Sequence, residues 1–532
     1  MRRVSAGFGF VLGMLTSIPI IVITFFGQQQ YGLPFPVFDL FDLMARILPG
    51  KMVTFGIDTI VKIISVFGSG GLSGTAKLAE HGIAIVQFVL IGGIVGLIIA
   101  LFGRRSTVID PSTVGLGTGA VLFGFFTGLY VKTGFPPAGI VVSVAWLGVV
   151  FIGWCVIQAA MVRGVAVAAG MPEDNPERRK ALYLGLSGLL AFLTGAFGLG
   201  YLWYRRKEAA TTQRSVRPLA PERTSGPAAS PSGRALARRW EPVPGTRPEV
   251  TPNPDFYRVD INSLPPQLNT EEWRLEIGGA VASPLKLTLP EIREMPAISQ
   301  YITLACISNP VGGDLISTTL LTGVPLATLM QKAGIRTEEV QGIQIECADG
   351  FYETVSAADM QDPRTLLAYA MNQEPLPAAH GFPLRIYIPN RYGMKQPKWI
   401  TRLTAISGGE GGFWEDRGWS QEARPHIVSI IDTVNQSGDG AVEVGGIAWA
   451  GDRGIQQVEL QVDDGDWEPA ELRSPPLSPL TWIQWRYQWQ GDPGKHEVRV
   501  RAYDGTGARQ IMQPGGPNPA GATGVDQQTF TI

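Results

Sequence analysis

The stretch "TLACISNPVGGDLIST" (303–318) places Cys306 at the end of a strand-like run, just before a turn rich in Pro and Gly. It is one of only three cysteines in the chain, with Cys155 and Cys347. Three roles are open for Cys306: an inert buried residue, a catalytic nucleophile, or a metal ligand. No local signature of a nucleophile with its base is visible. Because one thiolate cannot hold zinc alone, a metal here would need a cofactor that supplies further sulfur ligands.

The chain around this stretch divides into two unlike halves. It has 532 residues and a formal net charge of −2, which gives no reason to expect nucleic acid as a partner. In the first half, apolar runs approach the ~20 residues that a membrane-spanning helix needs. We expect an all-α domain over residues 1–205, with five transmembrane helices at 7–26, 83–102, 114–131, 139–162 and 182–204.

Short basic loops predict the orientation of these helices. Arg2-Arg3, Arg104-Arg105 and Arg178-Arg179-Lys180 would be cytoplasmic under the positive-inside rule, so the odd number of spans puts the C-terminal domains on the extracytoplasmic side. Arg205-Arg206-Lys207 argues against this orientation. The run 52–67 has apolar residues at helical spacing and is predicted to be an interfacial helix. If it spanned the membrane, the second half would face the cytoplasm.

Arg178-Arg179 also comes directly before the fifth expected span. Positive-inside anchoring is one interpretation, and a twin-arginine export signal is the other. Such a signal moves already folded domains across a membrane. The export-signal interpretation is therefore favoured if the exported part carries a cofactor that is inserted in the cytoplasm.

The second half of the chain begins with a linker. Residues 206–250 are rich in Pro, Ser, Gly and Arg without apolar periodicity, which is typical of a flexible tether. Residues 251–423 mix strand-like stretches such as "GIQIECADG" with helix-like ones such as "PLATLMQKAG", which predicts an α+β domain. From 424 to 532, short strands recur with turns between them, which favours an all-β immunoglobulin-like sandwich.

Two separated motifs carry a family resemblance. The stretch "LAYAMNQEPLPAAHGFPLRIYIPNRYGMKQPKWI" (367–400) closely resembles the pterin-binding segment of the sulfite oxidase family of molybdenum enzymes. The context "TLAC" is similar to that of the family's metal-binding cysteine and matches Cys306. The resemblance covers roughly residues 251–532, because the family also has an immunoglobulin-like C-terminal domain, and it does not cover the membrane half.

The resemblance implies a set of cofactor-binding residues: His380, Arg385 and Lys398, then Arg258 and Asn262 from "FYRVDINSLPP" (256–266), and Asn309. In "GFPLRIYIP", Arg385 alternates with Leu384 and Ile386, so its guanidinium is expected to point away from the packed face and can bind a phosphate bidentately. Lys398 would add a point charge, and a neutral His380 can bind the pterin. The alternative is a scatter of ordinary surface cations.

The family resemblance implies a molybdenum–molybdopterin cofactor, with Cys306 as the protein's one metal ligand. The implied activity of the protein is two-electron oxygen-atom transfer on a small substrate. Cys347 is expected to be a buried strand residue. His81 is the only histidine of the membrane half, so haem is not expected there. Electrons would pass to or from a separate partner, such as a cytochrome or a quinone-linked membrane protein.

Two departures from the family pattern bear on the substrate. Sulfite oxidases carry an arginine pair after the cysteine, in a sequence resembling "CAGNRR", whereas Pro310 and Val311 follow Asn309 in this chain. Asp362 stands near the position of the family's active-site tyrosine, where it can act as a catalytic base or bind a neutral or cationic substrate. Sulfite itself is therefore not the expected substrate.

These features together predict a multi-pass, membrane-anchored molybdopterin oxidoreductase. Two other hypotheses stay open. The soluble part can be a degenerate, non-catalytic subunit of a larger membrane complex, or the membrane half can be a transporter or sensor that the soluble part regulates. Few charged residues lie in the expected spans to support the transporter hypothesis.

Overall fold

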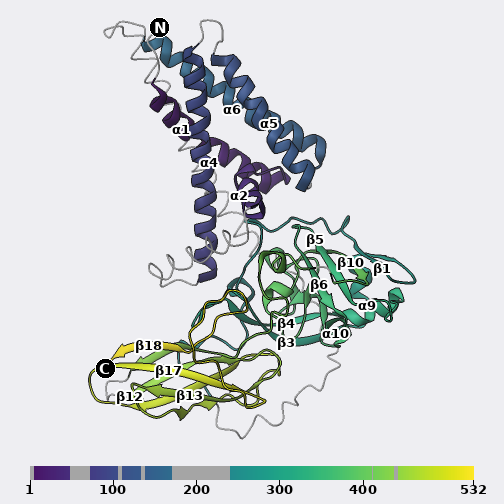
Figure 1. Cartoon of the computed structure of the whole chain (residues 1–532), viewed down its shortest axis with the longest axis vertical. Coiled ribbons are helices and arrows are strands. Elements are labelled where there is room, and N and C mark those ends of the chain that lie inside the picture. Colours follow the sequence, from purple (N-terminus) through teal and green to yellow (C-terminus); the bar gives the residue numbers. More distant parts are fainter. Residues whose placement is uncertain are drawn as a thin grey trace. The chain divides into compact units, whose positions relative to one another are not determined.

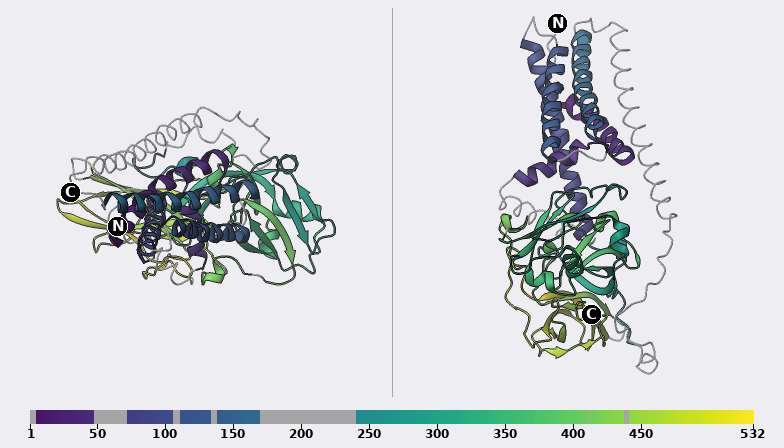
Figure 2. Two further views of the ribbon diagram at one scale, coloured as in Figure 1. Left: turned by 90° about the horizontal axis from the view of Figure 1, so that it is seen from above. Right: turned by 90° about the vertical axis from the view of Figure 1, so that its right-hand side faces the viewer.

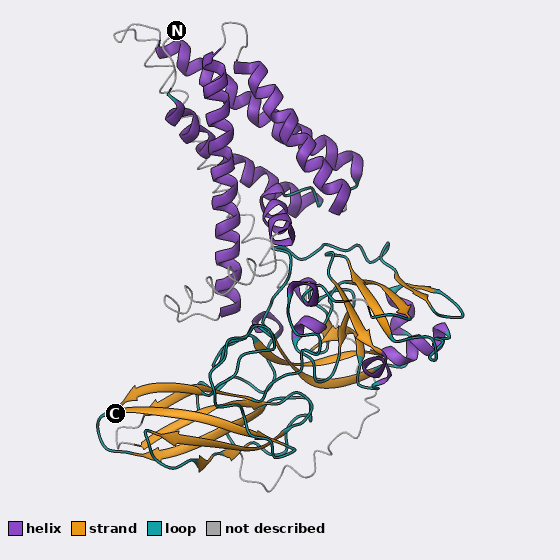
Figure 3. Cartoon of the chain, in the orientation of Figure 1, coloured by secondary structure: helices purple, strands orange, loops and turns teal. Residues whose placement is uncertain are grey.

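The computed structural model of the chain contains two compact units, a helical one and a strand-rich one (Figures 1 and 3). The described residues are 5–47, 72–105, 111–133, 138–169, 240–409, 411–436 and 441–532. The helical unit includes residues 262–267 of the second half, and the strand-rich unit holds the other described residues of that half.

The helical unit has four long apolar helices and one shorter helix. The helices are α1 (Ala6–Tyr31), α2 (Pro36–Ile47), α4 (Leu72–Arg105), α5 (Pro111–Thr133) and α6 (Ile140–Ala169). Among the described residues, 4 helices are long and apolar enough to cross a membrane, and they match the first four expected spans. The fifth expected span (182–204), the expected interfacial helix (52–67) and Arg178-Arg179 lie outside the described residues. The sequence reasoning did not predict α2.

Close backbone contact holds α1 against α4. A Cβ atom at Gly13 would lie 2.0 Å from the Gly92 carbonyl oxygen, and one at Gly96 would lie 2.1 Å from the Gly9 carbonyl oxygen. Both helices therefore carry small residues four apart on the contacting face, which is the pattern that lets helix backbones approach closely. The helices α5 and α6 run side by side (Figure 2), with Gly119 against the backbone of Phe151 and Ile152.

Residues 262–267 belong to the helical unit through Ser263. Its backbone N–H donates to Asp42 (3.1 Å), and its hydroxyl lies 2.8 Å from an Asp42 oxygen and 2.7 Å from a Glu80 oxygen. The ring of His81 stacks on Phe38, and its Nε2 lies 3.2 Å from the Ser263 carbonyl oxygen. His81 therefore has local partners within this unit.

The strand-rich unit begins with two sheets and short helices. The first sheet has the order β2-β1-β10-β5-β6, with β1 and β10 parallel. Its strands are β1 (Leu275–Gly279), β2 (Leu285–Leu287), β5 (Gly342–Cys347), β6 (Tyr352–Ser356) and β10 (Ile400–Ile406). The second sheet is antiparallel and consists of β3 (Ile298–Ala305), β4 (Ile316–Pro325), β7 (Leu366–Met371), β8 (Glu374–Pro375) and β9 (Arg385–Tyr387). The helices are α8 (Leu289–Arg293), α9 (Leu326–Ala333) and α10 (Ala357–Gln361).

The C-terminal region is built from two four-stranded antiparallel sheets. One has the order β11-β12-β16-β15 and the other β14-β13-β17-β18. The strands are β11 (Val428–Gln436), β12 (Ala441–Trp449), β13 (Ile455–Val462), β14 (Glu468–Pro469), β15 (Glu471–Leu472), β16 (Ile483–Gln490), β17 (Lys495–Asp504) and β18 (Asp526–Thr531). Alternate residues such as Val442, Val444, Val458 and Leu460 are buried in one core, as period-2 patterning predicts.

Candidate functional site

Cys306 lies in a loop that connects two paired strands. It follows β3 directly, and its backbone N–H donates to the Leu315 carbonyl oxygen (2.9 Å), which continues the pairing of β3 with β4. Within the loop, the Asn309 N–H donates to the Cys306 carbonyl oxygen (3.1 Å), and Asn309 Oδ1 accepts from the Leu315 N–H (2.9 Å). Asn309, a predicted cofactor-binding residue, thus fixes the shape of the loop that carries the thiol.

The strand before Cys306 is also tied to the C-terminal region of the same unit. The Thr303 N–H donates to the Leu480 carbonyl oxygen (3.0 Å), and the Trp482 N–H donates to Thr303 Oγ1 (2.8 Å). Backbone hydrogen bonds therefore hold the thiol-bearing strand from both sides.

The Cys306 thiol is buried and hydrogen-bonded. Its Sγ lies 3.0 Å from Ser308 Oγ. Burial raises the pKa of Cys306, and hydrogen bonds from Ser308 and from the Ile307 backbone N–H offset part of that rise. At neutral pH the free thiol is therefore protonated, and a metal that bound it would displace the proton.

The second predicted motif brings His380, Arg385 and Lys398 together around Gly381. The backbone at Gly381 has φ +112°, and a Cβ there would lie 2.9 Å from Arg385 Cβ and 3.2 Å from Lys398 Cβ. Only glycine fits such a position without strain. The predicted cofactor-binding cations are thus neighbours in space, and they are not scattered over the surface: Arg385 is buried and Lys398 is half-buried.

Arg385 is a buried cation with an unused donor. Side chains along β9 alternate between two faces, as expected: Leu384 and Ile386 lie in one core cluster, and Tyr387 lies in another. The face that carries Arg385 is therefore buried as well, and only 5% of Arg385 is exposed. One guanidinium nitrogen donates to the His380 carbonyl oxygen (3.2 Å), and Nε has no hydrogen-bond partner. Burial lowers the pKa of Arg385 to about 10.

Asp260 sits between two of the predicted cations. Its carboxylate pairs with both Arg258 and Lys398. Two cations thus pair with this one carboxylate, which also acts electrostatically on Arg385, and Asp349, whose pKa burial raises to about 6, is a further acid near Lys398. A buried, unpaired N–H on a guanidinium beside a lysine fits the phosphate of a pterin cofactor, because phosphate accepts several charge-assisted hydrogen bonds.

His380 is neutral in this environment. Burial, then the charges of Arg385 and Lys398, lower its pKa to about 4. Its Nε2 lies 3.2 Å from the Asn253 carbonyl oxygen, so that nitrogen must carry the hydrogen. Nδ1 therefore carries no hydrogen and can accept a hydrogen bond from a neutral donor group.

Tyr257 links the two motifs, and the sequence reasoning missed it. Its burial raises its pKa, and its hydroxyl interacts electrostatically with both Cys306 and Arg385. The signal was present in "FYRVDIN", where Arg258 was chosen and Tyr257 was not.

Asp362 is held in an ionic contact of its own, and Asn262 falls in the other unit. Asn262 is part of the segment grouped with the helical unit. Asp362 ends α10 and forms a two-pronged ion pair with Arg364, which also pairs with Asp452 (3.1 Å). Partial burial would raise the pKa of Asp362, but the Arg364 hydrogen bonds hold it below its ordinary value.

Cys347 and a second ionic cluster lie elsewhere in the unit. Cys347 is the buried last residue of β5, as expected. Lys395 Nζ donates to the fully buried Glu353 (2.7 Å) and also pairs with Glu415. Glu353 Oε2 has no partner, and burial raises the pKa of Glu353 to about 7. Sequence reasoning missed this cluster, whose members come from three separate segments.

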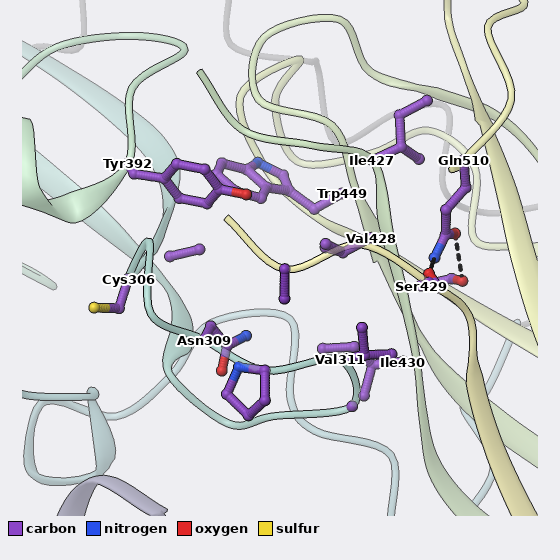
Figure 4. A pocket seen from close by; sticks show the side chains of 15 residues that line it. Cys306, Asn309, Val311, Tyr392, Ile427, Val428, Ser429, Ile430, Trp449 and Gln510 are labelled. Atoms are coloured by element: carbon purple, nitrogen blue, oxygen red, sulfur yellow. Dashed lines mark hydrogen bonds between the residues drawn. The ribbon is translucent and has the colours of Figure 1, made fainter. Parts of the chain in front are cut away.

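A small pocket lies behind the Cys306 loop (Figure 4). Its other lining residues include Asn309, Tyr392, Trp449 and Gln510, and none of its described lining side chains is charged. In Figure 4 the Cys306 sulfur points away from the other lining side chains.

The part of the chain that the structure describes contains no group of three or more His, Cys, Asp or Glu side chains that could hold a metal.

Comparisons with known proteins agree with this class. Residues 262–414 match the family described as "Oxidoreductase molybdopterin binding domain". Mitochondrial sulfite oxidase from Rattus norvegicus is 31% identical over 299 residues, covering 47% of this chain and 54% of that protein. The "putative protein-methionine-sulfoxide reductase subunit YedZ1" of Azospira oryzae is 29% identical over 154 residues, covering 29% of this chain and 56% of that protein. The solved sulfane dehydrogenase SoxCD from Paracoccus pantotrophus has a TM-score of 0.48 and 20% identity, over 60% of this chain and 95% of that one.

The expected resemblance is confirmed at this level: residues 262–414 match the molybdopterin-binding oxidoreductase domain, and part of the chain is similar to sulfite oxidase. The chain spans about half the length of the curated relatives named above.

Proposed function

We propose that the chain is a membrane-anchored molybdenum-cofactor oxidoreductase that carries out two-electron oxygen-atom transfer on a small substrate other than sulfite. The observation that carries this proposal is the buried Arg385 guanidinium with its unpartnered Nε, joined through Tyr257 to the fixed Cys306 thiol. Burying a guanidinium with an unsatisfied N–H costs free energy, and an anionic cofactor that accepts from this Nε would offset that cost.

Each residue has a role in this proposal. The cofactor, when bound, would supply the redox-active metal and its dithiolene sulfurs. Cys306 would be the protein ligand, and Arg385 and Lys398 would bind the cofactor phosphate. Neutral His380 would accept a hydrogen bond at Nδ1, and Asn309 would hold the loop shape. The ion pair of Asp362 with Arg364 favours a structural role for Asp362.

The sequence supports the remaining parts of the proposal. Pro310 and Val311 replace the arginine pair that sulfite oxidases use, so an anion such as sulfite has no cationic partner at those positions. We propose that residues 424–532 form an immunoglobulin-like sandwich, in keeping with their two antiparallel sheets. Electrons would pass to or from a cytochrome or quinone-linked membrane protein, with the C-terminal domains outside the cytoplasm.

Metal analysis of the full chain tests the proposal. Protein made in a host that synthesises the cofactor should contain about one molybdenum per chain, and Cys306→Ala should lose the metal or change its spectrum. Cys347→Ala is the matched control, because Cys347 is equally buried but lies on β5 and is assigned no ligand role. Wild-type chain without molybdenum would instead support the non-catalytic subunit.

A further inference from the structure

The Cys306 sulfur has a hydrogen-bond partner two residues further along the chain. Ser308 Oγ lies 3.0 Å from Sγ, and the backbone N–H groups of Ile307 and Ser308 act with it to offset the rise that burial causes in the pKa of the thiol. The Asn309 N–H donates to the Cys306 carbonyl oxygen (3.1 Å), which closes a turn around Ser308. The turn therefore holds Ser308 next to the sulfur.

The Ser308 hydroxyl becomes the donor once the sulfur loses its proton. With a protonated thiol, either atom of the pair can donate. A metal-bound thiolate has no hydrogen left, so only the Ser308 O–H can make the bond. Among the described residues, Cys306 is the one side chain that hydrogen-bonds the Ser308 hydroxyl, so its hydrogen is available.

We propose that Ser308 is a positioning residue that raises the reduction potential of the metal held at Cys306. The inference rests on the proposed function, since it requires a metal at that thiolate. A hydrogen bond to a ligand sulfur withdraws electron density from it and stabilises the more electron-rich, reduced state of the metal. Ser308 touches the ligand atom and is not expected to touch substrate.

Redox titration of the molybdenum-loaded full chain, followed by electron paramagnetic resonance of the Mo(V) state, tests this role. The reductant supplies one electron in each step. Ser308→Ala and Ser308→Gly both remove the hydroxyl and should lower the potentials. One lost charge-assisted hydrogen bond changes the equilibrium about tenfold, which is about 59 mV for a one-electron couple. Ser308→Thr keeps a hydroxyl and should restore the wild-type value.

Ser299→Ala is the matched control, because Ser299 lies on β3 and its hydroxyl bonds Thr322 (2.7 Å), away from the thiol. Full molybdenum content with lowered potentials in the Ala and Gly variants, and rescue by Thr, supports the inference. Unchanged potentials in loaded Ala or Gly variants overturn it while leaving the proposed function intact. Loss of metal from the Ala and Gly variants but not from Ser308→Thr also overturns the inference, because the hydroxyl would then be needed to retain the metal. Wild-type chain without molybdenum overturns both proposals.

Discussion

Replacing Arg385 by Met should change the metal-free and the cofactor-loaded chain in opposite directions. Burial lowers the pKa of Arg385 to about 10, which is well below the ordinary arginine value. At about 1.4 kcal/mol per pKa unit, keeping this group charged costs the folded, metal-free chain about 3 kcal/mol at neutral pH. Met is apolar and of similar length, so it removes that cost.

The metal-free Arg385→Met chain should therefore be more stable, by up to about 3 kcal/mol. For a domain of 150–250 residues this corresponds to a rise in melting temperature of about 6–12 °C. If Arg385 binds the cofactor phosphate as proposed, the same change removes at least one charge-assisted hydrogen bond from the loaded chain, worth about 1.5–3 kcal/mol, so cofactor affinity should fall at least about 10-fold.

Differential scanning fluorimetry of full chain made with and without the cofactor pathway, combined with molybdenum analysis, measures both effects. Arg402→Met is the control, because Arg402 is half exposed and pairs with Glu276 (2.8 Å). A lower melting temperature of the metal-free Arg385→Met chain, or undiminished molybdenum in the variant, would refute the reasoning.

Three further predictions concern pH and backbone geometry. The pKa of His380 is lowered to about 4 in the folded chain. Between about pH 6.5 and 4 the unfolded chain therefore binds a proton at this histidine and the folded chain does not, so the free energy of unfolding falls as the pH is lowered through this range. Urea unfolding of metal-free His380→Gln should show a flatter dependence in that range. The pKa of Glu353 is raised to about 7, so its contribution to stability is lost as pH rises from about 4.5 to 7, and Glu353→Gln should flatten this opposite slope. Gly381→Ala places a side chain at φ +112° and 2.9 Å from Arg385 Cβ, and should cost about 1–3 kcal/mol and reduce molybdenum content. At Gly408 an added Cβ meets nothing within 4 Å, so Gly408→Ala should leave both quantities unchanged.

Local sequence patterns were enough to predict several elements of the fold. The strand-like stretches that end at Cys306 and in "GIQIECADG" correspond to β3 and β5, and "PLATLMQKAG" corresponds to α9. The long apolar runs overlap α1, α4, α5 and α6, although α4 begins well before the expected span at 83. The short helix α2 was not predicted, because its 12 residues are too few to span a membrane and its pattern of apolar residues was not used.

The candidate site was predicted as a set of cations and a thiol, and its acids and tyrosine were missed. Arg385 and Lys398 could be predicted because both lie within the single stretch 367–400 that resembles the family's pterin-binding segment. Asp260 pairs with Lys398 across 138 residues of sequence, and no local pattern encodes such a contact. Asp362 was chosen for its position relative to a family motif, but its partner Arg364 lies only two residues away, so local pairing decided where its carboxylate points.

The hydrogen bonds between Thr303 and the segment 480–482 have a consequence for how the chain matures. The strand that presents Cys306 is complete only when the segment 480–482 has joined it. During synthesis this segment leaves the ribosome well after Cys306, so the loop stays unfinished until at least that much more of the polypeptide has been made. A cofactor that needs this loop therefore meets a chain that already includes the segment 480–482. The C-terminal strands, although separate in sequence, cannot be trimmed away or exchanged without disturbing the thiol.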